Sequence, residues 1–320
     1  MTNPVLSIIV LSYNTADITV NCLKSILTDK GLKETPYEII VIDNASTDDS
    51  ITKIKNLKIS NLQLITNTKN VGFSKGNNQG IKIAKGNYIL LLNSDTAILH
   101  SAISQSLDWL SSHPEALACT AQLLNPDKSI QPTGGFFPNI LNIFTWATGL
   151  DDLPFFGYLL KPFHPHTPSF YTHDSFYLHD QQLDWVTGAF LLTRHSTIDD
   201  VGGLDEDYFM YGEELEWCYR AKKTFPQSQI WYLVGPQVIH LGQASSSNSN
   251  LPYQREYQGI ITFFTKHKPV LLPIIKLCIL INRTLRASIY RFLPKNVITC
   301  YNKASSSYRV IERKGRYLND

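Results

Sequence analysis

Hydrophobic residues in the first 125 positions form short continuous runs that alternate with segments of helical spacing. Continuous apolar runs of this length are typical of strands that are buried on both faces of a sheet. They predict strands over residues 6–11, 38–42, 62–66, 88–92 and 116–124. Between these runs, apolar residues recur every three or four positions, as in a helix with one buried face. The predicted helices span residues 15–27, 46–58 and 73–85, and a fourth is marked by Ile103, Leu107 and Leu110.

Strands and helices that alternate in this way predict an α/β fold with a doubly wound, mostly parallel sheet. In such sheets, ligands bind beyond the carboxyl ends of the strands. Polar residues stand at three of these ends: Ser12, Tyr13 and Asn14, then Asp43 and Asn44, then Asn93 and Asp95. The sequence has no GxGxxG turn after the first strand and no GxxxxGK(S/T) loop, which argues against a typical dinucleotide site and a P-loop.

The pattern loosens between residues 125 and 184, where proline, glycine, histidine and aromatic residues are frequent. A long irregular stretch in a compact protein is usually a lid, a binding loop or a disordered segment. Further on, the sequence predicts regular structure over 185–193, a turn and an acidic helix over 202–220, strands over 230–234 and 237–240, and a polar loop over 244–250. We therefore divide the chain into residues 1–125, 126–250 and 251–320.

The composition adds limits on the class of protein. A length of 320 residues and a hydrophobic content of 43% are sufficient for a sizeable core. The five cysteines are odd in number, far apart and form no CxxC pair, so neither a zinc site nor a disulfide framework is indicated. A reducing compartment is the simpler interpretation. The N-terminus shows no secretory signal, and we expect a cytoplasmic protein.

Basic residues are concentrated near the C-terminal end. Residues 266–320 contain twelve lysines or arginines and two acidic residues, although the whole chain carries a net charge of only +2. The segment also contains apolar stretches. A segment that is both basic and partly apolar could lie on an anionic membrane surface. The longer stretch is interrupted by Pro273 and Lys276, which argues against a transmembrane helix. A helical pair packed on the body with a solvated basic face is an equally good interpretation.

Asn93 and Asp95 are alternate residues at the end of a buried strand, so their side chains are expected to point the same way. A divalent cation that is also bound by substrate phosphates needs only one or two protein carboxylates. Taken alone, the pattern is more typical of an Asx turn or a helix cap. The presence of Asp43 at the same edge of the sheet favours a ligand site.

Glu213 and Glu214 form a second acidic cluster. Acidic residues are favoured at helix N-termini, so a solvated helix start is the simpler explanation. The aromatic turn at residues 208–211 precedes them, and such a run tends to be buried or to line a pocket. His240 follows a short apolar strand, where a lone histidine is more often structural than a metal ligand. The residues alone thus indicate an acidic crevice that suits phosphate groups, and they name no substrate.

Several ordered segments narrow the function. They are SIIVLSYN at residues 7–14, VIDNASTD at 41–48, NVGFSKGNNQG at 70–80, LNSDT at 92–96, GAF at 188–190, GGLDE at 202–206, FMYGEE at 209–214 and VIH at 238–240. Together they resemble the family 2 glycosyltransferases of the GT-A fold, in particular the rhamnosyltransferase-like branch. The resemblance implies a nucleotide-diphospho-sugar transferase fold, with nucleotide-sugar binding in residues 1–125, acceptor binding and catalysis in 126–250, and an amphipathic basic helical segment in 251–320.

The resemblance also implies roles for individual residues. Donor binding falls to Ser12, Tyr13, Asn14, Asp43, Asn44, Gly72, Lys75, Asn78, Asn93 and Asp95, and acceptor binding to Trp185, Gly188 and Tyr211. Asp95 and His240 would hold Mg²⁺ or Mn²⁺. Glu214 would be the catalytic base, with Glu213 as the competing candidate. Two positions depart from the family pattern, because Asn93 replaces the first aspartate of the DxD metal motif and the usual Glu-Asp pair reads Glu-Glu.

An inverting glycosyltransferase is therefore expected, with dTDP-rhamnose as the first candidate donor and UDP-hexoses as the second. The acceptor would be a glycan or a lipid-linked glycan in cell-surface polysaccharide synthesis, reached through peripheral contact with the inner face of the cell membrane. No nucleic-acid partner is expected. One alternative is a sugar-nucleotide pyrophosphorylase, although the glycine-rich basic loop that it would need after the first strand is missing. Another is a non-catalytic nucleotide-sugar-binding module.

Overall fold

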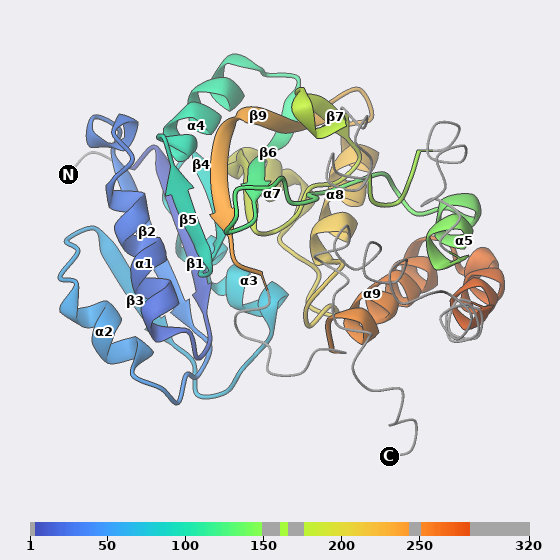
Figure 1. Cartoon of the computed structure of the whole chain (residues 1–320), viewed down its shortest axis with the longest axis horizontal. Coiled ribbons are helices and arrows are strands. Elements are labelled where there is room, and N and C mark those ends of the chain that lie inside the picture. Colours follow the sequence, from blue (N-terminus) through green and yellow to red (C-terminus); the bar gives the residue numbers. More distant parts are fainter. Residues whose placement is uncertain (1–3, 149–160, 166–175, 243–250, 282–320) are drawn as a thin grey trace.

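The computed structural model describes residues 4–148, 161–165, 176–242 and 251–281. One nine-stranded sheet runs through this part of the chain, and helices pack against it (Figure 1). Its strands follow the order β3-β2-β1-β4-β8-β6-β9-β5, and β7 pairs with β9. This is the α/β architecture that the alternating sequence pattern predicts.

The N-terminal part of the sheet is parallel. Its strands are β1 (Leu6–Ser12), β2 (Tyr37–Asp43), β3 (Leu62–Thr66) and β4 (Tyr88–Asn93), and its helices are α1 (Ala16–Leu27), η1 (Gly31–Lys33), α2 (Ser50–Asn56) and α3 (Phe73–Ile83). Successive residues of β1 point to opposite faces, so that Ile8 and Val10 enter one hydrophobic core and Ile9 enters the other. Both faces are buried, which explains the continuous apolar runs in the sequence.

The register aligns the carboxyl ends of these strands. Strand β1 lies between β2 and β4, with Ser12 opposite Asp43 and Leu11 opposite Asn93. The three strand ends that the sequence marks as polar are therefore neighbours along one edge of the sheet, which is where parallel sheets bind their ligands.

Helix α2 begins at Ser50, later than the predicted start at residue 46. Residues 46–49 form a turn instead, because Asp43 accepts a hydrogen bond from the Ser46 N–H and Asp48 accepts one from the Ser50 N–H. The residues that look like helix caps in the sequence thus stabilise a turn beside β2.

The second part of the sheet mixes strand directions. It contains β5 (Thr96–Leu99), β6 (Ala116–Leu124), β7 (Gln181–Leu183), β8 (Phe190–Arg194) and β9 (Gln229–His240), with helices α4 (Ala102–Ser112), α7 (His195–Val201) and α8 (Glu213–Thr224). Strands β6 and β9 are parallel, whereas β8 is antiparallel to β4 and β6, and both β5 and β7 are antiparallel to β9. The sequence analysis did not predict β5, β7 or α7, which are too short to show a clear periodicity.

The sequence predicts two short strands over 230–234 and 237–240, and the structure has the single strand β9 over both ranges. Its pairing with β6 shifts register, so that Ala121 faces Leu233 but the next residue, Gln122, faces Gln237. The residues skipped by this shift include a glycine and a proline, which are tolerated in a strand at such an irregularity. The break in the apolar pattern therefore marks a bulge within one strand.

The stretch 125–184 is more regular than predicted. It contains α5 (Ile140–Thr148) and the short turn η2 (Phe176–Leu178). Asn139 precedes α5 and accepts hydrogen bonds from the N–H groups of Leu141 and Asn142, as an N-terminal cap does. Residues 149–160 and 166–175, which belong to the predicted lid, lie outside the described residues, as does the polar loop predicted over 244–250.

Helix α9 (Leu251–His267), the turn η3 (Pro269–Leu271) and a helix over residues 272–281 complete the described C-terminal part. Phe263, Phe264 and Ile275 join these helices to the same hydrophobic core as α5. Of the predicted basic segment, residues 282–320 lie outside the described residues. Within the described part of the chain, no helix is both long enough and apolar enough to cross a membrane.

Candidate active site

Asp43 closes β2 at the carboxyl edge of the sheet and is fully buried. Its Oδ1 accepts a hydrogen bond from the Ser46 N–H over 2.9 Å, whereas its Oδ2 is buried with no partner among the described residues. A buried carboxylate oxygen that makes no hydrogen bond is costly in free energy. A ligand that donates a hydrogen bond, such as a nucleotide base or a ribose, would remove this cost.

Asn44 organises the turn before α3. Its amide nitrogen donates to Asn70 Oδ1 and to the Gly72 carbonyl, and its Oδ1 accepts from the Val71 N–H. Gly72 has a φ of 88°, and a Cβ atom on it would lie 2.6 Å from the Phe209 carbonyl oxygen. Only glycine suits this conformation and this approach. The donor-side turn therefore packs directly on the aromatic turn before α8.

Ser12 and Asn14 shape the end of β1. The buried Ser12 hydroxyl hydrogen-bonds with the Thr19 hydroxyl, and Asn14 Oδ1 accepts from the Thr47 N–H over 2.7 Å. Tyr13, between them, is half-buried and makes no hydrogen bond through its side chain within the described residues. Tyr13 therefore keeps a side chain that is available to a ligand, as does the exposed Asn14 through its amide nitrogen.

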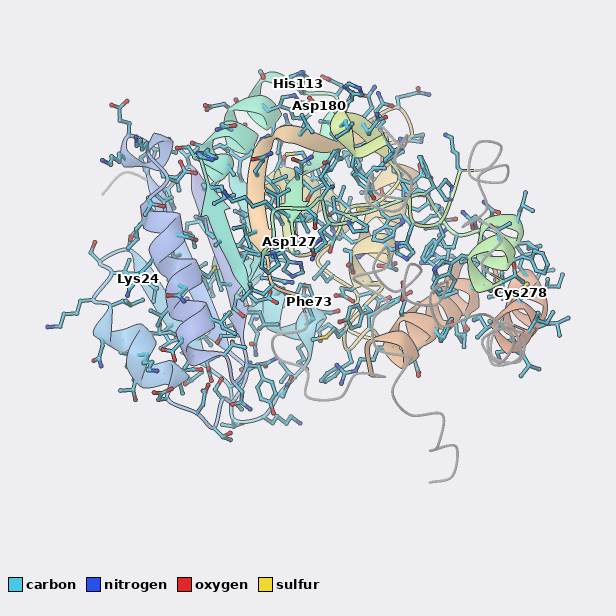
Figure 2. All side chains as sticks on the ribbon, in the orientation of Figure 1. Lys24, Phe73, His113, Asp127, Asp180 and Cys278 are labelled. Atoms are coloured by element: carbon cyan, nitrogen blue, oxygen red, sulfur yellow. The ribbon has the colours of Figure 1, made fainter. Side chains whose placement is uncertain are left out.

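Asn78 and Lys75 of α3 connect the two parts of the protein. The Asn78 amide donates to the Leu204 carbonyl and accepts from the Leu204 N–H, over 2.8 and 2.9 Å. Lys75 is exposed, with its Nζ 3.7 Å from Glu206 Oε2. The contacts of these two predicted donor residues thus anchor the segment before the aromatic turn. Phe73, at the start of the same helix, lies near the middle of the molecule in Figure 2.

The two predicted metal ligands meet where β4 and β9 end. Pairing of β5 with β9 places His240 opposite Thr96, the residue after Asp95. His240 Nε2 lies 3.2 Å from Asp95 Oδ1 and 3.3 Å from Asn93 Nδ2. The side chains of Asp95 and His240 are both largely buried. The structure therefore brings Asn93, Asp95 and His240 together at one point of the sheet edge.

Gln131, which the sequence analysis did not single out, fixes the His240 ring. Its Nε2 donates to Asn125 Oδ1 and to the His240 carbonyl, which leaves its Oε1 as an acceptor 2.6 Å from His240 Nδ1. In the neutral ring Nδ1 then carries the proton, and Nε2 presents a lone pair beside Asp95. Among the described residues no cluster of three His, Cys, Asp or Glu side chains is placed to hold a metal ion. Two ligands suit a divalent cation that completes its coordination with a diphosphate.

A short backbone segment connects this pair to the acidic cluster. The Asn93 N–H donates to the Ala189 carbonyl over 3.1 Å. The N–H of Gly188, the residue before Ala189, donates to the carboxylate of Glu214. Asn93 and Glu214, which are far apart in the sequence, are therefore separated in space by only these two small residues.

Glu213 and Glu214 begin α8. Glu213 is 3% exposed, and the Oε2 atoms of both residues are buried with no partner in the described part of the chain. Burial raises the pKa of both carboxyls, and the charge of Glu214 adds to the rise in the pKa of Glu213. The N–H groups of Gly188 and Gly212 favour the charged form of Glu214. Of the two carboxyls, Glu213 has the more strongly raised pKa.

Tyr211 and Trp185, the predicted acceptor residues, flank the acidic pair differently. Burial raises the pKa of Tyr211 to about 12, with further contributions from the charges of Glu256, Glu213 and Glu214. The buried Trp185 donates from Nε1 to the Phe136 carbonyl and pairs with Gly135 in an isolated bridge. Regular structure was predicted over 185–193, but Trp185 forms this separate bridge and strand β8 begins only at Phe190. Tyr211 therefore lies beside the acidic pair, whereas Trp185 is buried and makes its contacts with the backbone of residues 135 and 136.

Two further residues near Glu214 were missed by the sequence analysis. His164 Nε2 lies 2.8 Å from Glu256 Oε1, and the charge of Glu256 contributes to the raised pKa of Glu214, after the larger effect of burial. The contact joins residues 92 positions apart, in an irregular stretch and in the first turns of α9. No local sequence signal marks such a pair.

A buried carboxylate at the end of β2, an Asp–His pair at the strand ends and a buried carboxyl pair at the start of α8 are the features that the sequence resemblance leads one to expect of a GT-A glycosyltransferase. Residues 7–162 match the family model described as glycosyl transferase family 2. The chain belongs to the family 2 glycosyltransferases, and the resemblance noted in the sequence is confirmed.

Known proteins support this assignment. The chain is 26% identical over 220 residues, which are 65% of this chain and 67% of the other, to N-acetylglucosaminyl-diphospho-decaprenol L-rhamnosyltransferase of Mycobacterium tuberculosis. It is 26% identical over 242 residues, 73% of this chain and 82% of the other, to rhamnosyltransferase WbbL of Escherichia coli. A mannosyltransferase from Pyrobaculum calidifontis, solved with GDP-Man and Mn²⁺, superimposes with a TM-score of 0.53 at 15% identity, covering 97% of this chain and 82% of that one. The GT-A fold is thereby confirmed.

Proposed function

We propose that this protein is a metal-dependent, inverting glycosyltransferase that moves rhamnose from dTDP-rhamnose, or a hexose from a UDP-sugar, to a glycan or lipid-linked acceptor. The relatives are named as rhamnosyl- and glucosyltransferases of such acceptors, including N-acetylglucosaminyl-diphospho-decaprenol and, for an Escherichia coli enzyme, GlcNAc-diphosphoundecaprenol. These names support a place in cell-surface polysaccharide synthesis. The observation that carries the proposal is that the Gly188–Ala189 segment contacts both Glu214 and Asn93, whose side chain lies beside His240.

In this proposal Glu214 is the catalytic base. Its ionised carboxylate would take the proton from an acceptor hydroxyl as that oxygen attacks the anomeric carbon from the face opposite the leaving diphosphate. Glu213 would stay protonated and so would not compete for the role. The N–H groups of Gly188 and Gly212 orient the Glu214 carboxylate, which makes its position independent of flexible side chains.

The metal proposal rests on the lone pair of His240 and the carboxylate of Asp95. These are the residues that would hold Mg²⁺ or Mn²⁺, and Gln131 would keep the His240 ring in the required tautomer. A bound cation would neutralise the charge that develops on the departing nucleoside diphosphate. Residues 1–125 would supply the donor site through Asp43 and Tyr13, and residues 126–250 the acceptor side.

A panel of nucleoside diphosphates tests the donor assignment by thermal shift. A ligand present at a hundredfold excess over its Kd stabilises the folded state by about 2.7 kcal/mol, and we expect the largest shift from dTDP or UDP. Asp43→Asn should lose most of that shift, because the amide replaces a buried carboxylate oxygen that a base or ribose needs. Asp49→Asn, an exposed change of the same kind, is the control. Equal shifts in both variants and wild type would contradict the role of Asp43.

Turnover separates the transferase from the two alternatives. Incubation of the protein with Mn²⁺ and dTDP-rhamnose should release dTDP when the acceptor is added. A pyrophosphorylase would instead respond to pyrophosphate, and a binding module would release no product.

We further propose a peripheral membrane contact through the C-terminal helices. Val270, Ile274 and Leu277 are 86%, 46% and 55% exposed and follow a helical spacing that puts them on one side. The helix over residues 272–281, which carries Ile274 and Leu277, also carries Cys278, which lies at the opposite end of the long axis from Lys24 (Figure 2). The sequence beyond this helix, residues 282–320, contains nine lysines or arginines and two acidic residues. An apolar stripe followed by basic residues suits an anionic lipid surface.

Vesicle flotation tests the membrane contact. Wild-type protein should float with vesicles of phosphatidylethanolamine and phosphatidylglycerol, and less well with phosphatidylcholine alone. Ile274→Ser combined with Leu277→Ser should reduce binding roughly tenfold or more, since each half-exposed side chain contributes on the order of 1 kcal/mol of apolar burial. Leu27→Ser, a similarly exposed leucine on α1, should float like wild type. A double variant that floats as well as wild type would remove the proposal.

A further inference from the structure

Glu256 carries a carboxylate near the candidate base, Glu214. Only one of the two oxygens of this carboxylate has a hydrogen-bond partner among the described residues. Glu256 lies on α9, and its Oε1 is 2.8 Å from His164 Nε2. Its other oxygen, Oε2, accepts no hydrogen bond from the described residues, and about a quarter of the side chain is exposed. A second acceptor atom on a partly exposed side chain is suited to a hydrogen-bond donor of a ligand.

The His164 ring is held rigidly enough to orient this carboxylate. Its centroid lies 4.4 Å from that of Phe163 and 5.4 Å from that of Trp185, both in edge-to-face contact. Phe163 and Trp185 are both buried, so they cannot themselves offer a face to a sugar. The aromatic cluster therefore serves as a support for the His164–Glu256 pair, whose polar edge is the part that reaches solvent.

The position of Glu256 is unfavourable for the protein alone. Helix α9 packs on the turn before α8, because Gly259, three residues after Glu256, lies so close to the Tyr211 backbone that a Cβ atom there would collide with the Tyr211 carbonyl. In keeping with this contact, the charge of Glu256 raises the pKa of Tyr211 and of Glu214, in addition to the larger effect of burial. Like charges placed close together are destabilising unless something is gained from them. A sugar is the chemistry that would use both carboxylates, because one ring presents several neighbouring hydroxyl donors.

We propose that Glu256, oriented by His164, is an acceptor-binding residue whose Oε2 accepts a hydrogen bond from a hydroxyl of the sugar ring that offers its attacking hydroxyl to Glu214. This inference rests on the proposed function. It assigns a role in acceptor choice to α9, which lies outside the motifs of the family resemblance. The acceptor would be recognised by a hydroxyl adjacent to the one that reacts. An acceptor that lacks this hydroxyl would leave Oε2 without a donor and would bind less tightly.

The test measures acceptor binding apart from turnover. Full-length protein saturated with dTDP is titrated by calorimetry with N-acetylglucosaminyl-diphospho-decaprenol in detergent. Glu256→Gln keeps an acceptor for the His164 N–H but removes the charge, and we expect acceptor Kd to rise roughly tenfold, since hydrogen bonds to charged groups are the stronger ones. The Kd for dTDP should not change. His164→Ala should weaken acceptor binding as well, and His164→Gln, whose amide can still donate, should restore most of it.

The controls separate binding from a purely structural contact. Glu115→Gln, an exposed change of the same kind before β6, should bind the acceptor like wild type. Among single-deoxy acceptors, the one that binds wild type most weakly should bind wild type and Glu256→Gln equally well. If Glu256→Gln binds every acceptor as wild type does, the inference is wrong and the pair only tethers residues 161–165 to α9. If acceptor binding follows the expected pattern but no nucleoside diphosphate is released from dTDP-rhamnose or from UDP-hexoses, the proposed function fails while the assignment of Glu256 stands.

Discussion

Replacing Glu214 with glutamine is expected to slow sugar transfer by about 10²- to 10⁴-fold, the range that general-base catalysis supplies. The amide cannot take a proton from the acceptor, yet it fits the same space and can still accept from the Gly188 N–H. Binding of dTDP should therefore remain at the wild-type value. The rate of dTDP release with saturating acceptor, and calorimetric titration with dTDP, measure the two effects separately.

Glu213→Gln is the matched variant. Burial and the charge of Glu214 raise the pKa of Glu213, and in the proposed mechanism Glu213 stays protonated, the state that a neutral amide resembles. We expect a far smaller loss of turnover than in Glu214→Gln. The opposite order, with Glu213→Gln inactive and Glu214→Gln nearly normal, would assign the base to Glu213.

The pH dependence follows from the same carboxyl pair. Burial raises the pKa of Glu214 above its ordinary value of 4.5, and the base must be ionised, so transfer should fall as the pH drops through this raised pKa. Stability should change in the opposite direction. The folded protein binds the Glu214 proton more tightly than the unfolded chain does. Protonation of Glu214 therefore stabilises the folded state at pH values below the ordinary pKa, and this stabilisation is lost as the pH rises through the raised pKa of the folded state. Glu214→Gln should consequently melt at a higher temperature than wild type at pH 8, and at a similar temperature at pH 4.

The donor edge of the site could be predicted from the sequence because parallel strands impose a simple geometry. Asp43 and Asn93 each end a continuous apolar run, and β1 between them brings the two ends to neighbouring positions. The Asp95–His240 pair was not derivable in this way. Its contact depends on β5, a four-residue strand, pairing antiparallel with β9. Only the resemblance to a known family indicated it.

The residues that orient the site were beyond the reach of sequence patterns. Gln131 acts on His240 through a contact between positions 109 apart, and Glu256 meets His164 across 92. A polar side chain that is buried by tertiary packing has no periodicity to mark it. The contacts of Asn78 could not be predicted for the same reason. The family resemblance implies donor binding for this residue, but its side-chain amide makes two hydrogen bonds with the backbone of Leu204. Sequence motifs therefore indicated the candidate residues, and long-range hydrogen bonds show which of their polar atoms are already engaged within the protein.

Replacing Asp95 with alanine is expected to abolish the dependence of dTDP binding on Mn²⁺. Calorimetry with dTDP should show a large gain in affinity on adding Mn²⁺ for wild type and almost none for Asp95→Ala or His240→Ala, because each variant loses one of the two ligands proposed for the cation. Gln131→Leu should weaken Mn²⁺ binding roughly 10- to 100-fold, as is usual when the group that orients a ligating histidine is removed. Asn93→Asp, which restores the first aspartate of the family motif next to His240 Nε2, should instead tighten it. If Asp95→Ala responded to Mn²⁺ as wild type does, the cation would have to be held elsewhere, and the Asp95–His240 contact would be structural.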